Sequence, residues 1–487
     1  MTFNSDSPDS VKPMLIDGTW VTAPANAFPS VDPATGEQNY MISAAQTEHI
    51  DAAVDSAWRA VRQAAWRDML PHHRAAILRR IADGMEREAE LFASLQMREN
   101  GKVWRECQAQ VASAAATFRY YAGVVETVGA EVTPPRGNYL SMTRYEPYGV
   151  VVAITPWNSP LTMEAQKVAP ALAAGNAVIL KPSEVTSSPA LELGRLGLEA
   201  GLPPGILNVI TGTGAVAGKR LVEHPDVRMV SFTGGTLSGR AIARAAADKL
   251  MPVALELGGK SPHIVFADAD LDAAAEGVAG GIFEGSGQSC VAGSRLYVQR
   301  KVADRFLEKL IARAAAININ LPKHAGAEMG PIASFAHRDK IEGMVASARL
   351  EGAEVLTGAQ RPTGPALARG AFYEPTILSG LSSTATVVKE EIFGPVLCAL
   401  PFDDEEDLIA QANDSVYGLA SGIWTSDYRR AWRVASQLEA GTVWINTYKQ
   451  LSIATPFGGF KQSGLGREKG VNGLRLYQQT KGIYFAL

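Results

Sequence analysis

The sequence predicts an α/β protein built on a doubly wound parallel sheet. Apolar, strand-like runs recur about every 25 residues with helical stretches between them, a pattern typical of parallel strands joined by helical crossovers. These runs cover residues 150–155, 177–180, 206–210, 229–232 and 252–255. A second alternation follows, with strand-like runs at 264–266, 296–298, 371–377, 396–402, 422–424 and 442–445. A chain of 487 residues exceeds what one hydrophobic core usually serves, so more than one domain is expected.

The segment before the sheet reads as a strand followed by helices. Residues 14–21 are predicted as a strand, and residues 91–128 as one helix. Between them, apolar residues at three- and four-residue steps predict two amphipathic helices, one carrying Val54, Trp58, Val61 and Ala65 and the other Ile77, Ile81, Met85 and Ala89.

Two segments look like strands without a local partner. Residues 131–146 alternate around Pro134 and Pro135, which predicts a hairpin arm whose edge another subunit would cover. Residues 480–487 form an apolar strand with nothing nearby in the sequence to pair with. We therefore expect a homodimer or a homotetramer.

Composition excludes several classes of protein. A net charge of -4 leaves no basic footprint for nucleic acid. The polar segment 1–12 does not resemble a secretory signal, and no run approaches the roughly 20 apolar residues that cross a bilayer. Cys107, Cys290 and Cys398 are too scattered for a disulfide framework or a metal cluster, so we expect a cytoplasmic protein without a metal.

Polar residues follow several of the predicted strands. They are Trp157 and Asn158, the run 181–184, Thr211 and Gly212, and the run 233–235. Parallel sheets bind nucleotides at the carboxyl ends of their strands, so these residues are candidate cofactor contacts. Gly212, Gly214 and Gly218 approach the dinucleotide glycine fingerprint, but their spacing is one residue too long, which makes this a weak signal.

Glu256 and Cys290 are the candidate reactive pair. A thiolate can attack a carbonyl carbon, and a carboxylate can later activate water to release the acyl group. Each residue also has an ordinary structural interpretation. A lone cysteine is commonly an inert core residue, and a glutamate after an apolar strand is commonly a partnered polar group at a sheet end.

The chain resembles the aldehyde dehydrogenase superfamily from about Met14 to its end. The matching motifs, in chain order, are Thr155-Pro156-Trp157-Asn158, Lys181-Pro182-Ser183-Glu184, Phe232-Thr233-Gly234-Gly235-Thr236, Glu256-Leu257-Gly258-Gly259-Lys260, Gly287-Gln288-Ser289-Cys290, Glu391-Ile392-Phe393-Gly394-Pro395 and Pro456-Phe457-Gly458-Gly459. The resemblance implies an NAD(P)-binding domain at 1–124 and 148–257, a catalytic domain at 258–458, and an oligomerisation arm at 125–147 and 474–487.

The resemblance also implies an activity: NAD(P)-dependent oxidation of an aldehyde to its carboxylic acid. Cys290 would form a thiohemiacetal and then a thioester. Asn158 and the backbone N–H of Cys290 would form the oxyanion hole, and Glu256 would activate the hydrolytic water. Lys167 and Glu468 match positions of a proton route, although a purely structural ion pair explains them equally well.

The implied cofactor contacts are spread over most of these motifs. They are Thr155, Trp157, Lys181, Ser183, Glu184, Gly214, Phe232, Gly234, Gly235, Leu257, Glu391 and Phe393. NAD is preferred because the Glu184 carboxylate would accept hydrogen bonds from the adenine ribose and repel a 2′-phosphate. Lys181 acts in the opposite direction, so NADP remains an alternative.

The implied substrate tunnel contains Ser159, Met163, Gln166, Ser289, Val291, Leu451 and Phe457. Ser159 and Gln166 stand where bulky aromatic residues often occur in relatives, so aromatic or longer aldehydes are expected to outperform acetaldehyde. No arginine stands out in these stretches to bind a carboxylate, which disfavours an acidic semialdehyde.

Other functional classes share parts of this pattern. A cysteine hydrolase would need a histidine base near the thiol, and none of the motifs contains one. A CoA-acylating dehydrogenase has no use for a water-activating glutamate, so Glu256 disfavours it. A relative without activity would be expected to have lost Cys290 or Glu256, and both are present.

Overall fold

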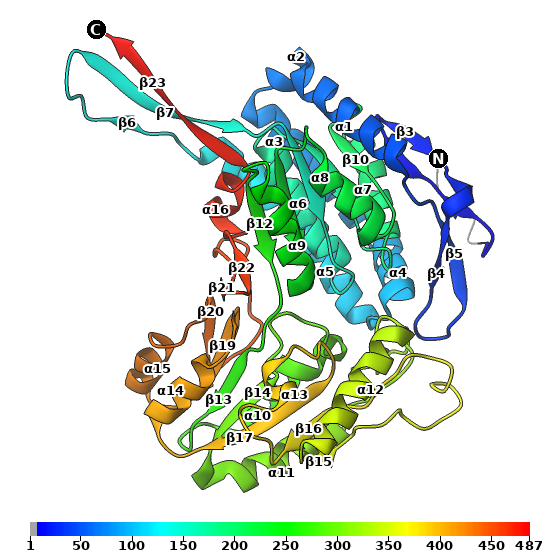
Figure 1. Ribbon diagram of the computed structural model, residues 1–487, viewed down its shortest axis with the longest axis vertical. Helices are drawn as coiled ribbons and strands as arrows, with labels where there is room; N and C mark the ends of the chain where they lie inside the picture. Colours follow the sequence, from blue (N-terminus) through cyan, green and yellow to red (C-terminus); the bar gives the residue numbers. More distant parts are fainter. Residues whose placement is uncertain (1–6) are drawn as a thin grey trace.

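The computed structural model describes residues 7–487 and consists of two lobes with a β arm projecting from one of them (Figure 1). The first six residues of the predicted segment 1–124 lie outside the described residues. Each lobe contains its own twisted sheet, and the polypeptide passes between the lobes after strand β12.

The sheet of the upper lobe has eight strands in the order β22-β12-β11-β8-β9-β10-β2-β3. Its central strands are parallel, namely β8 (Val150–Ile154), β9 (Ala177–Lys181), β10 (Leu207–Val209), β11 (Met229–Thr233) and β12 (Val253–Glu256). Since β8 lies between β9 and β11, the chain winds away from β8 in both directions. The doubly wound sheet is thus confirmed, and the β8–β11 boundary is the switch point where such sheets bind ligands.

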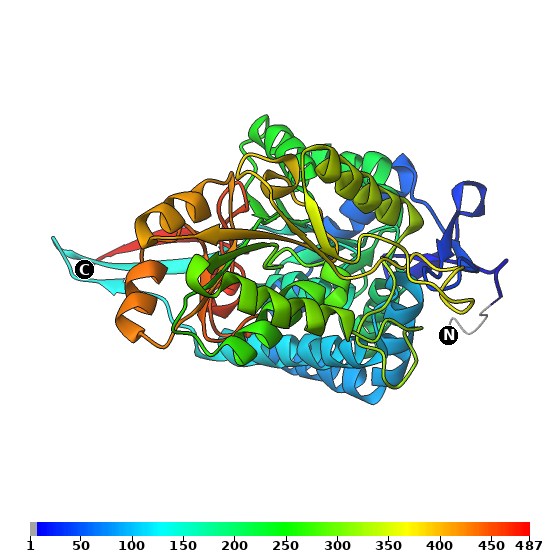
Figure 2. The ribbon, with the colours of Figure 1, turned by 90° about the horizontal axis from the view of Figure 1, so that it is seen from below.

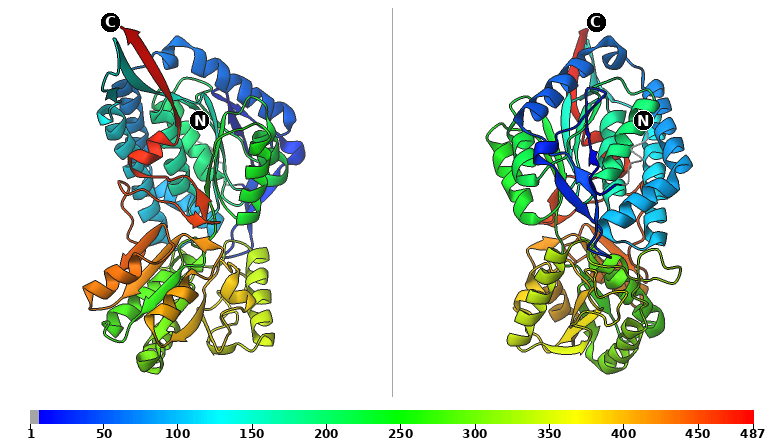
Figure 3. Two further views of the ribbon diagram at one scale, coloured as in Figure 1. Left: turned by 60° about the vertical axis from the view of Figure 1, so that its left-hand side comes forward. Right: turned by 90° about the vertical axis from the view of Figure 1, so that its right-hand side faces the viewer.

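Helices cover both faces of this sheet (Figure 3). Strands β8 and β9 are buried along their whole length, as expected for apolar strands between two helical layers. The helices of this lobe are α1 (Thr47–Arg62), α2 (Ala64–Arg67), α3 (Pro71–Arg87), α4 (Ala89–Asn100), α5 (Trp104–Thr127), α6 (Pro160–Ala173), α7 (Ser188–Glu199), α8 (Lys219–Glu223), α9 (Thr236–Ala247) and α16 (Gly470–Arg475).

The sheet of the lower lobe has seven strands in the order β15-β16-β17-β14-β13-β19-β20. They are β13 (Pro262–Val265), β14 (Arg295–Gln299), β15 (Glu354–Thr357), β16 (Thr376–Ser379), β17 (Val396–Phe402), β19 (Ala420–Trp424) and β20 (Thr442–Ile445). Only β15 runs antiparallel to its neighbour. Its helices are α10 (Leu271–Phe283), α11 (Ala303–Ala315), α12 (Phe335–Leu350), α13 (Thr386–Lys389), α14 (Glu405–Asn413) and α15 (Tyr428–Ala435).

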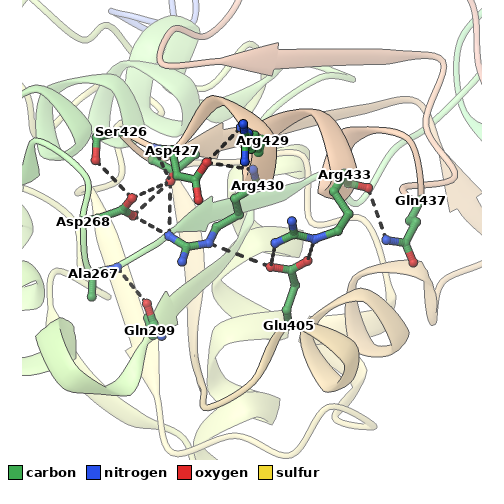
Figure 4. Close-up of polar contacts among 11 residues, drawn as sticks. Ala267, Asp268, Gln299, Glu405, Ser426, Asp427, Arg429, Arg430, Arg433 and Gln437 are labelled. Atoms are coloured by element: carbon green, nitrogen blue, oxygen red, sulfur yellow. Dashed lines mark hydrogen bonds and ion pairs between the residues drawn. The ribbon is translucent and has the colours of Figure 1, made fainter.

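Internal ion pairs occupy the carboxyl ends of β13 and β19, the switch point of this second sheet. Asp268 accepts hydrogen bonds from Thr425 and Ser426 and pairs with Arg430 at 2.9 Å (Figure 4). The Glu405 carboxylate, on α14, contacts Arg430 and forms an ion pair with Arg433. Both arginines lie on α15. The protein's own side chains therefore saturate this position, whereas the corresponding position of the first sheet is open.

The arm joins two segments that are far apart in the sequence. Strand β23 (Gln478–Ala486) pairs antiparallel with β7 (Tyr139–Pro147), and β6 (Val132–Thr133) adds a short third strand. The arm extends well beyond the helices of its lobe (Figure 2). The terminal strand thus pairs with the predicted hairpin, and Tyr484 and Leu487 remain 70% and 74% exposed.

Three predicted segments differ from the structure. Residues 14–21 form a hairpin of β2 (Met14–Ile16) and β3 (Thr19–Val21), because Asp17 and Gly18 adopt positive φ. Residues 91–128 form two helices, because Gly101 ends α4 in the left-handed conformation with Pro331 packed against it. In the predicted strand 371–377, only the last two residues belong to β16.

The remaining short strands form two small separate sheets and one edge strand of the upper-lobe sheet. They are β1 (Val11–Lys12), β4 (Phe28–Val31) and β5 (Gln38–Ile42) in one sheet, β18 (Tyr417–Gly418) paired with β21 (Phe460–Lys461), and β22 (Gly464–Leu465) at the edge beside β12. Over residues 7–487, no helix is both long and apolar enough to span a membrane.

Candidate active site

A cavity of about 650 Å³ lies at the carboxyl ends of β8, β11 and β12. It brings together Asn158, Glu256, Cys290 and Glu468, together with Trp157, Gly234, Gly235, Leu257, Glu391 and Phe393 of the predicted cofactor set. All predicted tunnel residues line it as well: Ser159, Met163, Gln166, Ser289, Val291, Leu451 and Phe457. Sequence positions from 109 to 469 therefore meet in one space.

The loop before Cys290 has an unusual backbone that delivers the thiol to this cavity. Gly285, Ser286 and Gly287 all have positive φ, which turns the chain sharply after α10. The Ser286 hydroxyl donates to the Gly330 carbonyl at 2.8 Å and anchors the turn. Holding a serine in the left-handed region costs energy, and such conformations cluster where geometry serves function.

The Cys290 thiol is protonated in this environment. Burial raises its pKa to about 12, and the nearby Glu391 and Glu256 carboxyls add to the effect. Backbone N–H groups of Cys290 and Val291 face the sulfur and act in the opposite direction. The thiol therefore needs a base, or added positive charge, before it can attack a carbonyl carbon.

The side-chain amide of Asn158 donates one hydrogen bond within the protein and can donate a second. Its Nδ2 donates to the Gln288 carbonyl at 2.9 Å, which fixes the side chain against the cysteine loop. An amide nitrogen carries two hydrogens, so one remains for a ligand oxygen. The geometry suits a neutral donor beside the nucleophile.

Glu256 ends β12 and is 5% exposed. Burial raises the pKa of this carboxyl well above its usual range, and Glu468 adds to the effect, while Lys167, Arg467 and Lys469 oppose it. Its Oε2 has no hydrogen-bond partner among the described residues. A buried carboxyl with a raised pKa is a candidate general base.

The glycines that follow Glu256 allow three segments to meet. A Cβ at Gly258 would overlap the Glu391 carboxyl, and one at Gly259 would overlap the Cys290 carbonyl. Only glycine therefore lets the β12–β13 connection pass between these two residues. The sequence motif at this point is a requirement of close packing.

Lys167 and Glu468 form a buried ion pair behind the cavity. Their atoms Nζ and Oε1 lie 2.6 Å apart, with the side chains 0% and 2% exposed. Lys167 also donates to the Ser231 hydroxyl at 3.1 Å. Glu468 lines the cavity and lies within electrostatic range of Glu256, whereas Lys167 does not reach the lining.

Glu391 and Phe393 form the opposite end of the cavity. The Glu391 carboxylate accepts a hydrogen bond from the Gly259 N–H at 2.9 Å, and burial raises its pKa to about 7. Phe393 has a positive φ, and its ring packs edge-on against Trp157 with centroids 5.3 Å apart. His337 contacts the Phe393 carbonyl at 2.8 Å and supports this loop.

The other predicted cofactor residues surround the carboxyl edge of the sheet without lining the cavity. Thr155 follows β8, Phe232 lies in β11, and Gly214 begins the turn before α8. Lys181 is buried, and its Nζ lies 3.4 Å from Glu184, whose side chain is 44% exposed. The Ser183 hydroxyl accepts the N–H of Val185.

Several cavity residues were not identified from the sequence. Helix α5 contributes Gln110, Ser113 and Thr117, and Lys340, Ile453 and Lys469 complete the wall. Gln110 donates to the Ser159 hydroxyl at 3.2 Å. Tyr448 supports the cysteine loop from behind, because its hydroxyl donates to the Val291 carbonyl at 2.9 Å. Helix α5 carried no motif, so only its packing against α6 could reveal its role.

With this geometry established, similarity to known proteins identifies the class. The aldehyde dehydrogenase family model matches residues 20–483, so the chain belongs to the aldehyde dehydrogenase family. The betaine aldehyde dehydrogenase of Bacillus subtilis (strain 168) is 41% identical over 473 residues, which cover 97% of this chain and 96% of that protein.

Solved structures agree with this assignment. A betaine aldehyde dehydrogenase from Staphylococcus aureus in complex with NAD+ is 38% identical with a TM-score of 0.96, covering 98% of this chain and 95% of that one. An NAD+ complex of an aldehyde dehydrogenase from Bacillus cereus is 39% identical with a TM-score of 0.96, covering 98% and 97%. Within the described part of the chain, no group of three or more His, Cys, Asp or Glu residues could hold a metal ion.

Proposed function

We propose that this protein is an NAD-dependent aldehyde dehydrogenase that releases a free carboxylic acid, with Cys290 as nucleophile and Glu256 as the base for water. The observation that carries the proposal is the meeting of Cys290, Asn158 and Glu256 in one cavity at the switch point of a doubly wound sheet. Family membership and relatives solved with NAD+ support the same activity.

The residues around the switch point fit a dinucleotide. The hydroxyls of Thr155 and Thr233 are buried there without a partner among residues 7–487, as expected of groups that await a ligand. Gly235 precedes α9 with open space where a Cβ would stand, and a helix N-terminus favours phosphate. Glu391 and Phe393 would hold the nicotinamide half, while Lys181 and Glu184 would hold the adenine ribose. When bound, NAD supplies the hydride acceptor.

The chain's own groups account for the remaining steps. The Cys290 thiol gives its proton to Glu256 or to water, and its sulfur adds to the aldehyde carbon. The free hydrogen of Asn158 Nδ2 and the backbone N–H of Cys290 stabilise the resulting oxyanion. After oxidation the acyl group remains on sulfur as a thioester. Glu256 then takes a proton from water and passes it toward Glu468 and Lys167.

The substrate is an aldehyde that reaches Cys290 past Ser159, Gln166, Leu451 and Phe457. The named relatives include betaine aldehyde dehydrogenases. The roomy, polar wall supports aldehydes longer than acetaldehyde. Each buried methylene contributes about 0.8 kcal/mol, so the gain in kcat/KM across a chain-length series should exceed tenfold.

We further propose the division into an NAD-binding domain at 1–124 and 148–257, a catalytic domain at 258–458 and an arm at 125–147 and 474–487. The arm's exposed Tyr484 and Leu487 support a homodimer or homotetramer in which a second copy covers them. Light scattering showing only a 51.8 kDa species at micromolar concentration would contradict the assembly.

The test is formation of NADH by the purified protein with a panel of aldehydes, followed by identification of the acid product. NADH formation that needs aldehyde and no CoA supports the proposal. Release of acid from a thioester without NADH formation from any aldehyde would instead indicate a cysteine hydrolase. A strict requirement for CoA would indicate an acylating enzyme. The same assay with NADP decides the cofactor preference.

A further inference from the structure

Lys469 is a buried lysine in the wall of the cavity, and its ammonium has no ion-pair partner in the described part of the chain. Its residue is 7% exposed, and within residues 7–487 its ammonium makes no hydrogen bond or ion pair. The contact that it does make is with the Phe457 ring, whose centroid lies 5.2 Å from Nζ. Burying an unpaired ammonium is costly, so its presence beside a ligand cavity points to a ligand that compensates it.

The charges around Lys469 do not neutralise it. Glu468 is already paired with Lys167 at 2.6 Å. Burial raises the pKa of the Glu256 carboxyl well above its usual range and the pKa of the Cys290 thiol to about 12, which weakens both as counter-charges for Lys469. Burial also lowers the pKa of Lys469, and no ion pair with a described residue offsets this cost, so the charge of its ammonium form is uncompensated. An anion that enters with the substrate would balance it.

The backbone at Lys469 is strained as well. Its φ of 60° and ψ of 173° lie in a region that is essentially restricted to glycine. Lys469 directly precedes helix α16, which begins at Gly470. The strained position is thus occupied by a lysine, although the glycine that would adopt this conformation easily stands one residue later. Strain of this kind is tolerated where the side chain is needed at a particular point in space.

The cavity lining also includes neutral polar groups. Gln166 is 5% exposed, and its Oε1 has no partner in the described chain. The Gln110 Oε1 is likewise buried and unpartnered, although its Nε2 donates to Ser159. These amides can solvate the polar end of a substrate without repelling a negative charge.

We propose that Lys469 binds a carboxylate at the far end of the substrate, so that the preferred substrate is a short aldehyde acid, the semialdehyde of a dicarboxylic acid. This inference rests on the proposed aldehyde oxidation. Lys469 lines the same cavity as Cys290 and Glu256 and lies within electrostatic range of both, so one substrate molecule can contact Cys290 and Lys469 together. The absence of an arginine in the motifs does not exclude such a substrate, because folding places a lysine in the wall.

The test compares aldehydes of equal chain length with and without the carboxylate. Succinic semialdehyde is paired with butanal, and glutaric semialdehyde with pentanal. The measured quantity is the ratio of kcat/KM for the acid to that for the neutral aldehyde. In the wild-type protein this ratio should exceed 10, and in Lys469→Met it should fall about 10- to 100-fold, the range for a hydrogen bond to a charged group. Lys469→Arg should retain most of the preference.

Lys340→Met is the matched control, because it removes an ammonium from the Glu391 end of the same cavity. Its ratio should stay at the wild-type value, whereas a fall equal to that of Lys469→Met would show that only net charge matters. A binding measurement separates recognition from chemistry: Cys290→Ala should bind succinic semialdehyde more tightly than butanal, and the further change Lys469→Met should remove the difference.

The outcomes are distinct. Equal losses for acidic and neutral aldehydes in Lys469→Met would show that Lys469 acts on Glu256 or Cys290, and would overturn the proposal. A wild-type ratio near 1 would overturn it too, while leaving aldehyde oxidation intact. If no aldehyde of either kind yields NADH, the proposed function itself fails.

Discussion

The two ends of the cavity handle buried charge in opposite ways. At the Glu391 end, the carboxylate accepts the Gly259 N–H, Lys260 and Lys340 lie within electrostatic range, and burial raises its pKa only to about 7. At the Lys469 end, Glu256 has an unpartnered oxygen and a pKa well above its usual range, and Lys469 has no ion pair among the described residues. The Glu391 carboxylate is thus hydrogen-bonded by the protein, whereas one oxygen of Glu256 has no partner among the described residues.

The difference indicates how one cavity can serve two ligands. A satisfied carboxylate is a rigid, permanent contact, which suits a cofactor that binds in the same way in every cycle. Unsatisfied groups are costly until a ligand arrives, which suits a reaction whose charges change from step to step. Substitutions at the two ends should therefore fail in different ways.

The largest effect is expected from Cys290→Ala, which removes the proposed nucleophile. Aldehyde oxidation should fall to background, a loss of more than about 10³-fold, while the Kd for NAD changes little. NADH formation and calorimetric titration with NAD measure the two quantities. Cys107→Ala and Cys398→Ala are the controls, since both cysteines are buried away from the cavity lining. Residual turnover by Cys290→Ala would contradict its role.

Glu256→Gln should slow steady-state turnover by about 10²–10⁴-fold, the usual contribution of a positioned base. If Glu256 acts only on water, stopped-flow kinetics should still show a stoichiometric burst of NADH, and mass spectrometry should find the acyl group on Cys290. Loss of the burst would mean that Glu256 also deprotonates the thiol. Wild-type turnover would mean that Glu256 is structural.

The pH profile gives an independent measure of the same group. Because the pKa of Glu256 is raised, its basic form becomes populated only as pH rises, so the hydrolysis rate should increase with pH up to that pKa. Burial and the nearby Glu468 raise the pKa of Glu256, whereas the positive charges of Lys167, Arg467 and Lys469 lower it. The rise of the rate with pH reports this pKa. This rise should be absent from Glu256→Gln. A flat profile in the wild-type protein would contradict a raised pKa for the rate-limiting base.

A smaller effect is expected at the satisfied end. Glu391→Gln keeps an oxygen for the Gly259 N–H but loses the charge, so KM for NAD should rise about 10-fold with less change in kcat. In the wild-type protein, KM for NAD should also rise as pH falls below about 7, because the carboxyl becomes protonated. Glu390→Gln, at an exposed neighbouring position, is the control. An unchanged KM would exclude Glu391 from the cofactor site.

The smallest effect concerns stability. Lys469→Gly relieves a backbone conformation that costs about 1–3 kcal/mol and removes an unpaired buried charge. The free energy of unfolding should therefore rise by about 1 kcal/mol after the lost packing of the side chain is included. Urea unfolding measures it. Leu250→Gly, at a positive φ on the surface and 92% exposed, tests strain relief away from the cavity. A less stable Lys469→Gly would mean that packing against Phe457 outweighs the strain.

The sequence alone was sufficient for much of the architecture. The spacing of apolar runs predicted the parallel sheet of the upper lobe and a second strand–helix alternation after it, because a buried parallel strand must be apolar along its whole length and a crossover helix needs a minimum length. Local conformation was predicted less well. The turn at Asp17 and the break at Gly101 depend on single residues at positive φ, which a periodicity of apolar residues does not register.

The residues of the candidate site also fall into two groups, those that the sequence identifies and those that only the structure reveals. Cys290, Glu256 and Asn158 lie in motifs that the sequence displays directly. Only the tertiary structure decided which other groups share their cavity, because α5 and the residues before α16 reach it through contacts that span hundreds of positions. Whether a lysine is paired depends on the distances to every nearby carboxylate, and these distances exist only in the folded chain. Lys167 and Lys469 have the same side chain, yet Lys167 pairs with Glu468, whereas Lys469 lines the cavity and contacts the Phe457 ring.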